Sequence, residues 1–591
     1  MRNSSRNRVD GKKQVRLEPL NTFFLKNLRV KGFYSQNVLA ASVIDLSFEI
    51  IEKDLLGRIG KLRTKSGTII TPLILPVVNP SIQLIPASSL KEEFKCQAII
   101  TNAYILLKNY AQRAISKKIH RFLDFDGVIM TDSGAYQILI YNNIQATPEE
   151  IINFQEEVDS DIAVILDVPT GWNTNKKRAQ WTVDETIKRA KMMFKIKKKN
   201  DVLWVGPIQG GKYLDLIDHS ASEMSKYPFD IYALGSPTPI MEQYLYSSLV
   251  KMILTAKNAL SIDKPFHLFG AGHPIMFPFA IALGCDIFDS AAYALFARDQ
   301  KFMTSWGTLE LRDIEYFPCS CNICSSITPN ELREKPRAEI EALLARHNLN
   351  ICFTEINKIK QAIHEGRLWE MLQMRSRSHP SLKNAFNEMK RATKMMVAHT
   401  PVSKRKGLFY YDSFDLNRPE IVRFQSRVEN INTNMNRENV LLLLPFHGKP
   451  MHVLPNLKDF LNELFNSIGS KLNIIKICFY SAPLGIVPFE LDDVYPVSQM
   501  QASYIDKETE GHVLNSIDVY IRKVKHNHII LYMEEKNEIS QLLNIKLSKM
   551  SQNIGFNLQV IQPEYQVWSK ESTKLLSEKI TQVLELVKEL K

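Results

Sequence analysis

Eight short apolar runs recur between residues 70 and 300, and each ends in a small or polar residue. The runs begin at Thr71, Cys96, Gly127, Asp161, Leu203, Asp230, Pro265 and Cys285. Helical patterns lie between several of them, as at 147–158 and 240–260. Because the runs are continuously apolar rather than alternating, they indicate strands buried on both faces, which is typical of a parallel sheet.

Eight β/α units within about 230 residues predict an α/β fold of the (β/α)8 TIM-barrel type. A doubly wound sheet is the alternative. That fold usually has five to seven strands and carries a glycine-rich phosphate-binding turn after the first strand. The segment "PVVNP" that ends the first run is not such a turn.

The carboxyl ends of the predicted strands carry a set of polar and small residues. In a TIM barrel these ends form the active site. We therefore expect one group of residues around the barrel mouth: Asp132, Asp167, Gln209, Gly235, Ser236, Gly270, Ala271, Gly272 and Asp289. For any single aspartate a helix N-cap is the alternative, but a set at the same end of the repeat favours a site.

Enzymes that break glycosidic bonds usually use a pair of carboxylates, one as the nucleophile and the other as the general acid and base. We expect Asp132 to face Asp289 across the barrel. Asp167 and Gln209 can read the donor and acceptor edges of a flat heterocycle. Tyr136 and Phe269, just past the third and seventh strands, are placed to stack on its faces. The pattern predicts a nucleobase whose N-glycosidic bond lies beside a carboxylate.

Three cysteines crowd into six residues of "YFPCSCNICSS", with the spacing C-x-C-x2-C at Cys319, Cys321 and Cys324. A closed tetrahedral zinc site needs a fourth ligand, and His347 follows 23 positions after the last cysteine. Thiolates with an imidazole favour zinc over magnesium or calcium, and four protein ligands indicate a structural ion. An iron–sulfur cluster is a less favoured alternative, and His267, His273 and His364 compete for the fourth position.

The chain has 591 residues, which predicts two to four domains, and a net charge of +12. Such a charge favours a polyanionic partner, most commonly nucleic acid. Two basic clusters, 188–199 and 404–406, are candidate phosphate contacts, with solvated surface as the alternative. No apolar run approaches the ~20 residues that a membrane span needs. The N-terminus lacks a secretory core, and a cytoplasmic protein is expected, with a mitochondrial presequence as the weaker alternative.

Several motifs resemble the tRNA-guanine transglycosylases, and the archaeal branch in particular. They are "TDSGAYQ", "ILDVPT", "PIQGG", "YALGS", "HLFGAGHP", "GCDIFDSAAYALFARD", "GTLELRDIEYFPCSCNIC" and "RHNL", within a match from about Phe48 to about His379. The resemblance implies a TIM barrel with a zinc site that exchanges a guanine in tRNA for a free 7-deazaguanine. The archaeal branch inserts 7-cyano-7-deazaguanine (preQ0) at position 15 of the D-loop. Ala135 departs mildly from the pattern, which often has a second glycine there.

The resemblance also implies a role for each matching residue. Asp289 would be the nucleophile on the ribose C1′, giving a covalent ribosyl-aspartate, and Asp132 the general acid and base. Contacts to the base would come from Asp167, Gln209, Gly235 and Ser236, with Tyr136 and Phe269 on its two faces. The zinc ligands would be Cys319, Cys321, Cys324 and His347. The implied partners are tRNA and free preQ0, and the implied assembly is a homodimer.

Four segments are expected. Residues 1–44 form a basic, partly disordered extension, and 45–382 form the barrel with its zinc site at 319–347. Residues 383–500 resemble the α/β domain that follows the barrel in archaeal transglycosylases and in archaeosine synthase, and 501–591 form a further α/β region without an evident PUA domain. The stretch 445–451 lacks the cysteine that carries amidination in the synthase, so we expect no such chemistry here.

Two other functions are alternatives. The first is a non-catalytic tRNA-binding subunit, but such paralogues typically lose the nucleophile, and both aspartates are present. The second is a barrel enzyme acting on a small nucleoside, against which the basic charge and the large C-terminal extension argue.

Overall fold

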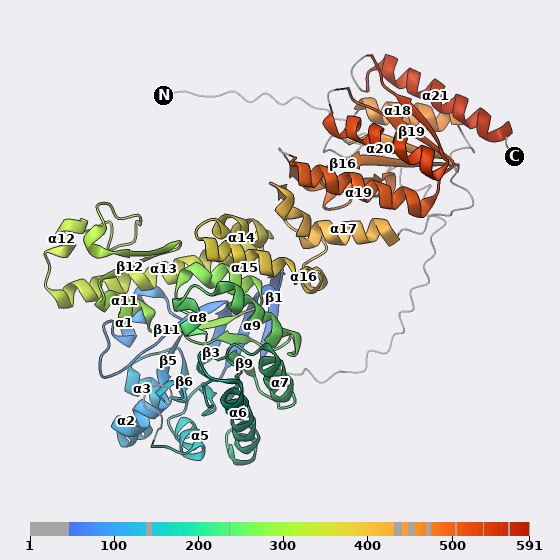
Figure 1. Cartoon of the computed structure of the whole chain (residues 1–591). Helices are drawn as coiled ribbons and strands as arrows, with labels where there is room; N and C mark the ends of the chain where they lie inside the picture. The colour runs from blue at the N-terminus through green and yellow to red at the C-terminus, as the bar shows by residue number, and fades with distance from the viewer. Residues whose placement is uncertain are drawn as a thin grey trace, which may run out of the picture. The chain divides into compact units, whose positions relative to one another are not determined.

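The computed structural model describes residues 47–137, 145–235, 237–430, 440–446, 455–468, 474–502, 505–535, 537–564 and 568–589 (Figure 1). The basic extension expected at 1–44, the candidate base contact Ser236 and most of the 445–451 stretch therefore lie outside the described residues.

Eight parallel strands form one sheet, in the order β4-β11-β10-β9-β8-β7-β6-β5. They are β4 (Leu73–Pro76), β5 (Ala98–Asn102), β6 (Val128–Asp132), β7 (Ile162–Val164), β8 (Leu203–Ile208), β9 (Ile231–Leu234), β10 (Phe266–Leu268) and β11 (Ile287–Ser290). Just past β4, the Val78 amide donates to the Ile100 carbonyl on β5 at 2.8 Å, which joins the two ends of the sheet. Each apolar run of the sequence forms one strand, so the TIM-barrel prediction is confirmed over the doubly wound alternative.

Helices follow the strands and surround them (Figure 1). They are α2 (Ala103–Lys117), α5 (Pro148–Glu157), α6 (Lys176–Ile196), α7 (Leu214–Met224), α9 (Tyr246–Asn258), α10 (Phe277–Ala282) and α11 (Ala292–Arg298), with the further helices α1 (Ala87–Phe94), α3 (Ile119–Leu123) and α8 (Thr238–Glu242). Their starts are fixed locally. Thr147 and Glu150 form a reciprocal capping box at α5, and the Asn175 side chain caps α6.

A three-stranded antiparallel meander closes the amino end of the barrel. It consists of β1 (Phe48–Asp54), β2 (Gly57–Thr64) and β3 (Gly67–Thr71), and β3 leads directly into β4. Phe48, Leu62 and Ile69 pack into one apolar cluster with the inward-facing residues of the barrel strands. A buried ion pair of 2.7 Å between Arg58 and Asp286 ties β2 to the start of β11. Among the described residues, the barrel is therefore open only at the carboxyl ends of its strands.

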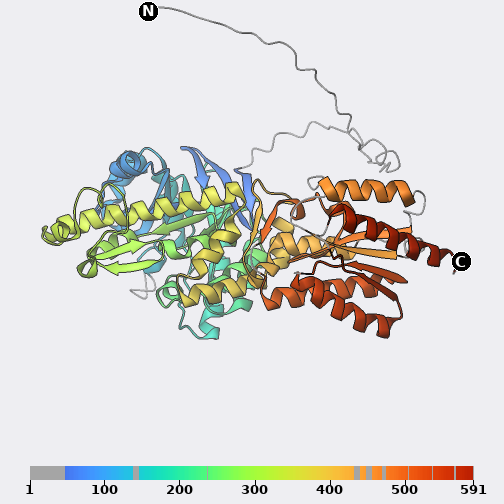
Figure 2. The ribbon, with the colours of Figure 1, turned by 90° about the horizontal axis from the view of Figure 1, so that it is seen from above.

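A hairpin and a long helix follow the barrel. The hairpin is β12 (Lys301–Thr304) with β13 (Gly307–Glu310), and α12 (Pro329–Arg333) leads to α13 (Arg337–Glu365), which packs on α11 and β12 and runs along the barrel (Figure 2). Three further helices, α14 (Leu368–Ser376), α15 (Pro380–Lys390) and α16 (Thr393–His399), complete this region. The cysteine-rich segment lies between β13 and α12.

The C-terminal part is a five-stranded open sheet in the order β17-β16-β15-β19-β20, parallel except for the edge strand β17. Its strands are β15 (Val440–Pro445), β16 (Ile475–Ser481), β17 (Gly485–Pro488), β19 (His528–Tyr532) and β20 (Asn557–Ile561). Helices α18 (Pro455–Ile468), α19 (Lys507–Val524), α20 (Glu538–Ile554) and α21 (Lys570–Glu589) cover its faces (Figure 2).

The expected boundary at residue 500 does not separate two sheets. Strand β15, which lies before the boundary, pairs in parallel with β19, which lies after it. Parallel neighbours are joined by long crossover connections, so strands of one sheet can be far apart in the sequence. In the same way β14 (Leu408–Tyr410) pairs with β18 (Met500–Ala502), and α17 (Pro419–Asn430) packs beside β17. Across the described residues, no helix is both long and apolar enough to cross a membrane.

The basic cluster 404–406 is not a free phosphate-binding surface. The Lys404 side chain is only 2% exposed and pairs with the buried carboxylates of Asp54, at 2.6 Å, and Glu420. Arg405 pairs with Glu52 at 3.1 Å. A buried lysine held between two carboxylates is committed to structure and Arg405 is ion-paired, so the cluster does not present three free cations.

Candidate active site

Asp132 is the last residue of β6, in register with Asn102, the last residue of β5. Its Oδ2 accepts a hydrogen bond from the Gly134 amide at 3.2 Å and a longer one from the Asn102 side-chain amide at 3.4 Å. Gly134 has φ +87°, and a Cβ there would collide with Tyr104 and Asn102, so the turn requires glycine. Burial, followed by the charges of Asp167 and Asp289, raises the pKa of Asp132 to about 7.

Asp167 follows β7 and is held by Gln209, which follows β8. The Gln209 side-chain amide donates to Asp167 Oδ2 at 2.5 Å, while its Oε1 accepts from the Thr170 amide at 2.9 Å. Burial raises the pKa of Asp167 to about 6, against the lowering effect of the Gln209 hydrogen bond. Gly235 lies against the Gln209 amide, and a Cβ at this position would overlap it. The strand ends thus place a carboxylate and an amide side by side, with space kept by a glycine.

Asp289 lies on β11 and accepts two hydrogen bonds through the same oxygen. Its Oδ1 is 2.9 Å from the His267 Nε2 and 2.9 Å from the Gly270 amide. The carboxylate side chain is 14% exposed, and His267 on β10 is fully buried. The His267 Nδ1 has no hydrogen-bond partner among the described residues. A neutral ring with its proton on Nε2 fits this arrangement, because a proton on Nδ1 would be buried without an acceptor.

The three carboxylates lie at the carboxyl ends of β6, β7 and β11, and therefore at one mouth of the barrel. An acid whose pKa lies near neutrality can both give and take a proton. A second carboxylate beside it, held by donors through one oxygen, keeps its other oxygen for attack on an electrophile. The chemistry available is nucleophilic substitution with proton transfer to and from the leaving and entering groups.

The two predicted stacking residues lie at the same mouth but differ in setting. Tyr136, two residues beyond Gly134, is 54% exposed. Phe269 is half-buried directly after β10, with its ring centroid 4.5 Å from that of His267. Both residues follow strand ends that form the mouth, and their stacking on a flat ligand stays a prediction.

Two neighbours of the carboxylates were not among the residues selected from the sequence. Asn102 contacts Asp132, and the strand-end rule applied to "CQAIITNA" points to it. His267 contacts Asp289, but from the sequence it was considered only as a zinc ligand. Its place on β10, two residues before Phe269 and therefore on the same side of the strand, is the signal that identifies it.

Cys319, Cys321, Cys324 and His347 come together with all four ligand atoms within 4.8 Å of one another. The Cys321 and Cys324 sulfurs are 3.6 Å apart and lie 3.5 and 3.4 Å from the His347 Nδ1. Metal–sulfur bonds of ~2.3 Å and metal–nitrogen bonds of ~2.0–2.1 Å in a tetrahedron imply edges of about 3.8 and 3.5 Å. The group has the size of a four-coordinate metal site.

The surroundings of His347 orient it for this role. Its Nε2 lies 2.9 Å from the Met303 carbonyl, which leaves Nδ1 toward the sulfurs, and Phe302 stacks on its ring. The competing histidines are engaged elsewhere: His267 with Asp289, His273 with Thr308 and His364 with Glu52. The described residues therefore favour His347 as the fourth ligand.

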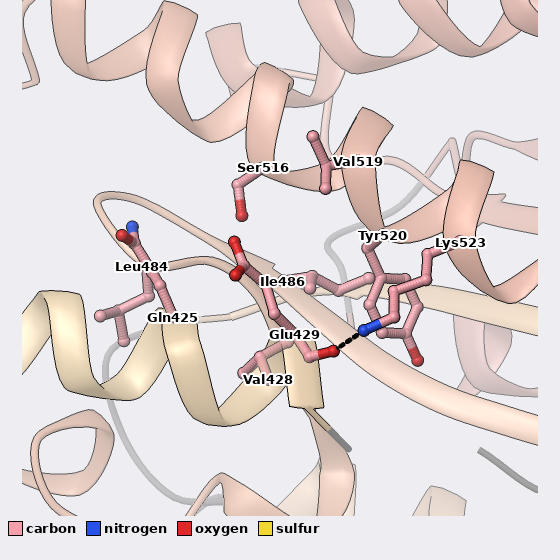
Figure 3. Close-up of a pocket in the computed structure, with 9 residues that line it drawn as sticks. All are labelled: Gln425, Val428, Glu429, Leu484, Ile486, Ser516, Val519, Tyr520 and Lys523. Atoms are coloured by element: carbon pink, nitrogen blue, oxygen red, sulfur yellow. Dashed lines mark hydrogen bonds between the residues drawn. The ribbon is translucent and has the colours of Figure 1, made fainter. Parts of the chain in front are cut away.

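The C-terminal sheet has a hollow of its own, between α17, the β16–β17 hairpin and α19 (Figure 3). It encloses about 20 Å³, and the Lys523 ammonium reaches across it to the Glu429 carbonyl. A single water fills such a space. A nucleobase does not fit in this hollow.

The family described as queuine tRNA-ribosyltransferase matches residues 54–381, and a domain of unknown function, DUF5591, matches residues 421–580. Three similar proteins are named tRNA-guanine(15) transglycosylase. The one from Methanocaldococcus jannaschii is 37% identical over 87% of this chain and 79% of its own length. Those from Pyrobaculum aerophilum and Sulfolobus acidocaldarius are 42% and 39% identical, over 80% and 83% of this chain and 95% of each relative.

Proposed function

Because this chain belongs to the queuine tRNA-ribosyltransferase family and is a glycosyltransferase, we propose that it replaces guanine 15 in the D-loop of tRNA with free preQ0, in archaeosine biosynthesis. The observation that carries the proposal is the convergence of Asp132, Asp167 and Asp289 on one barrel mouth. The names of the relatives support position 15. The choice of preQ0 rests on the family resemblance.

In the proposed reaction the free oxygen of Asp289 attacks the ribose C1′ and the bond from C1′ to the guanine nitrogen breaks. Asp132, protonated in part near neutral pH, gives its proton to the departing base. A covalent ribosyl-aspartate remains. The Asp132 carboxylate then takes the N–H proton of the entering base, whose nitrogen attacks C1′ and releases Asp289. Two displacements retain the configuration at C1′.

The base is proposed to bind over the carboxylates with its polar edge toward Asp167, Gln209 and Gly235. Asp167 accepts from ring and exocyclic N–H groups, while the Gln209 amide is already oriented by Asp167 and Thr170. Ser236 is proposed as a further contact. Tyr136 and Phe269 are proposed to cover the two faces and to keep water from the ribosyl-aspartate, which water would otherwise hydrolyse to an abasic site.

We propose zinc as the ion of the cysteine–histidine group, on the basis of its three sulfurs, one nitrogen and tetrahedral spacing. Cys319, Cys321, Cys324 and His347 would hold it. With four protein ligands it would stabilise the segment between β13 and α13 and take no part in the chemistry. A homodimer and a cytoplasmic location are proposed from the family resemblance.

The test is base exchange with purified protein, unmodified tRNA and labelled guanine or preQ0. Incorporation of label is expected with wild type and is expected to be lost in Asp289→Ala, while a transcript with adenine at position 15 takes up none. A denaturing gel of wild type with tRNA and no free base separates a covalent adduct from free protein, and the adduct is expected to be absent in Asp289→Ala. Binding of tRNA by wild type without any exchange would instead support the non-catalytic subunit.

A further inference from the structure

We propose that the first two turns of α6 and the loop after β8 form a tRNA-binding surface beside the barrel mouth. We call it the α6 surface: Lys177, Arg178, Trp181, Lys212 and Tyr213. It rests on the proposed function, because it names where that function's macromolecular substrate is held.

The position of α6 relative to the mouth follows from two hydrogen bonds. The Val168 amide donates to Thr186 Oγ1 at 3.0 Å, and the hydroxyls of Thr170 and Thr182 are 2.6 Å apart. Residues just past the end of β7 thus lie level with 182–186 of α6. At 1.5 Å per residue, the segment 176–178 extends roughly 6–9 Å beyond residue 182, past the strand ends and on the side where substrate enters.

The loop after β8 packs against the same end of α6. The Tyr213 hydroxyl donates to the Thr174 carbonyl at 3.1 Å, and Lys176 pairs with Asp215 at 2.7 Å. Tyr213 also packs in one apolar cluster with Ala179 and Val183 of α6. Lys212 is therefore brought beside the cations of α6. The surface adjoins the site itself, since Thr170 binds both Thr182 and the Gln209 side chain.

The charge of this surface is not balanced by acids. Lys177, Arg178 and Lys212 are exposed, and none of them has an acidic partner in the part of the chain that the structure describes. Asp215, which follows Lys212 and Tyr213 in the chain, is paired with Lys176. Uncompensated, solvated cations are available to phosphates, and their association is driven by release of counterions.

An exposed aromatic pair adds a second kind of contact. Trp181 is 44% exposed, and the Arg178 guanidinium lies 3.8 Å from its ring centroid. Lys212 lies over the Tyr213 ring in the same way, at 5.6 Å. Flat aromatic and guanidinium groups stack on unpaired bases, while the adjacent charges hold the backbone. An RNA whose target base has left its stack supplies both partners.

The other end of α6 differs, although it is richer in lysine. This far end adjoins the closed amino end of the barrel, where Lys199 and Lys65 share Asp159 at 2.9 and 2.7 Å. Lys188 pairs with Glu185. The cluster 188–199 therefore lies away from the mouth and provides a matched control on the same helix.

The test compares two triple variants of the full chain. The first is Lys177→Ala, Arg178→Ala, Lys212→Ala, and the second is Lys191→Ala, Lys195→Ala, Lys198→Ala. The first is expected to raise KM for unmodified tRNA and the Kd for tRNA by tenfold or more, with KM for the free base and kcat unchanged. The slope of log Kd against log salt concentration is expected to be smaller by roughly 2 in the first variant than in wild type. Three cations are removed, and each phosphate contact contributes about 0.7–0.9 to the slope. The second is expected to change Kd by less than twofold.

Trp181→Ala is expected to weaken tRNA binding more than Trp181→Phe, because phenylalanine keeps a stacking face. Equal tRNA affinities and salt slopes for the two triple variants would overturn the α6 surface, even with exchange intact. Wild type that binds tRNA without exchanging bases would overturn the proposed function alone, since the comparison of Kd values still decides where tRNA is held. Melting temperatures of all variants establish that they are folded.

Discussion

His267 Nε2 lies 2.9 Å from Asp289 Oδ1, and the same oxygen accepts from the Gly270 amide. Both donors therefore hold one oxygen of the proposed nucleophile and leave the other for the ribose. The imidazole is a positioning group, since it acts on the carboxylate and not on substrate.

His267→Phe is expected to lower the single-turnover rate of adduct formation by roughly 10–100-fold, because a hydrogen bond to a charged group contributes about 1.5–3 kcal/mol. His267→Gln, whose amide nitrogen can replace Nε2, is expected to restore most of that loss. KM for tRNA and zinc content should not change. Equal rates in the two variants would show that the ring only fills space.

Asp132 predicts an unusual pH dependence of stability. The pKa of its carboxyl is raised from 3.8 to about 7 in the folded protein. Between these values the unfolded chain ionises first, so the free energy of unfolding falls as pH rises from about 4 to 7. Asp132→Asn removes this loss. Its gain in the free energy of unfolding is expected to be larger at pH 8 than at pH 5 by about 2.6 kcal/mol, measured by urea denaturation.

Asp184→Asn, an exposed aspartate on α6, is the control and should give the same small change at both pH values. A pH-independent effect of Asp132→Asn would contradict the buried setting of the carboxyl.

The rate of guanine release should report the same group. With Asp132 as the acid, the single-turnover rate is expected to fall as pH rises through about 7. The charge of Asp167 helps to raise the pKa of Asp132, so Asp167→Asn should move this falling limb to lower pH, in addition to weakening base binding. A limb that stays in place in Asp167→Asn would argue against Asp132 as the acid.

The metal site predicts a loss of stability on ligand removal. Cys319→Ser is expected to abolish binding of the proposed zinc ion, measured by elemental analysis, and to lower the melting temperature markedly, because ion binding and local folding are coupled. Ser320→Ala changes the exposed residue between two ligands and should leave both quantities unchanged. Zinc retained by Cys319→Ser would remove Cys319 from the ligand set.

Gly235 is expected to set the space available to the base. Gly235→Ala adds a methyl group that overlaps the Gln209 amide, so KM for the free base should rise by about tenfold while Kd for tRNA stays the same. Gly511→Ala, in a helix with open space around it, is the control and should be neutral or stabilising. A normal KM in Gly235→Ala would show that Gln209 can yield without loss of recognition.

The sequence predicts the barrel well because each strand is a separate apolar run, and the topology follows from the repeat. Asp132, Asp167 and Asp289 follow from the same rule, since parallel strands bring their carboxyl ends together. The hydrogen bond between His267 and Asp289 cannot be predicted from the sequence, because it depends on how the side chains of two adjacent strands are oriented toward each other. The five-stranded C-terminal sheet also escapes prediction, since β15 pairs with β19 across more than 80 residues.

The burial of Lys404 shows the same limit for charge. Its sequence neighbours make it look like a surface cation, yet its partners, Asp54 and Glu420, are contributed by distant segments. The folded structure is needed to tell which lysines form buried ion pairs and which, like those of the α6 surface, face solvent.

The β1–β3 meander has a consequence for the order of events. Phe48, Leu62 and Ile69 of the meander pack against the inward-facing residues of the barrel strands. In the part of the chain that the structure describes, this end of the barrel is therefore closed to small molecules. In the proposed exchange, the old base has to depart along the route by which the new one arrives, past a ribose still tethered to the protein. The two bases then occupy the pocket by turns, and varying their concentrations should give the parallel-line pattern of a double-displacement enzyme.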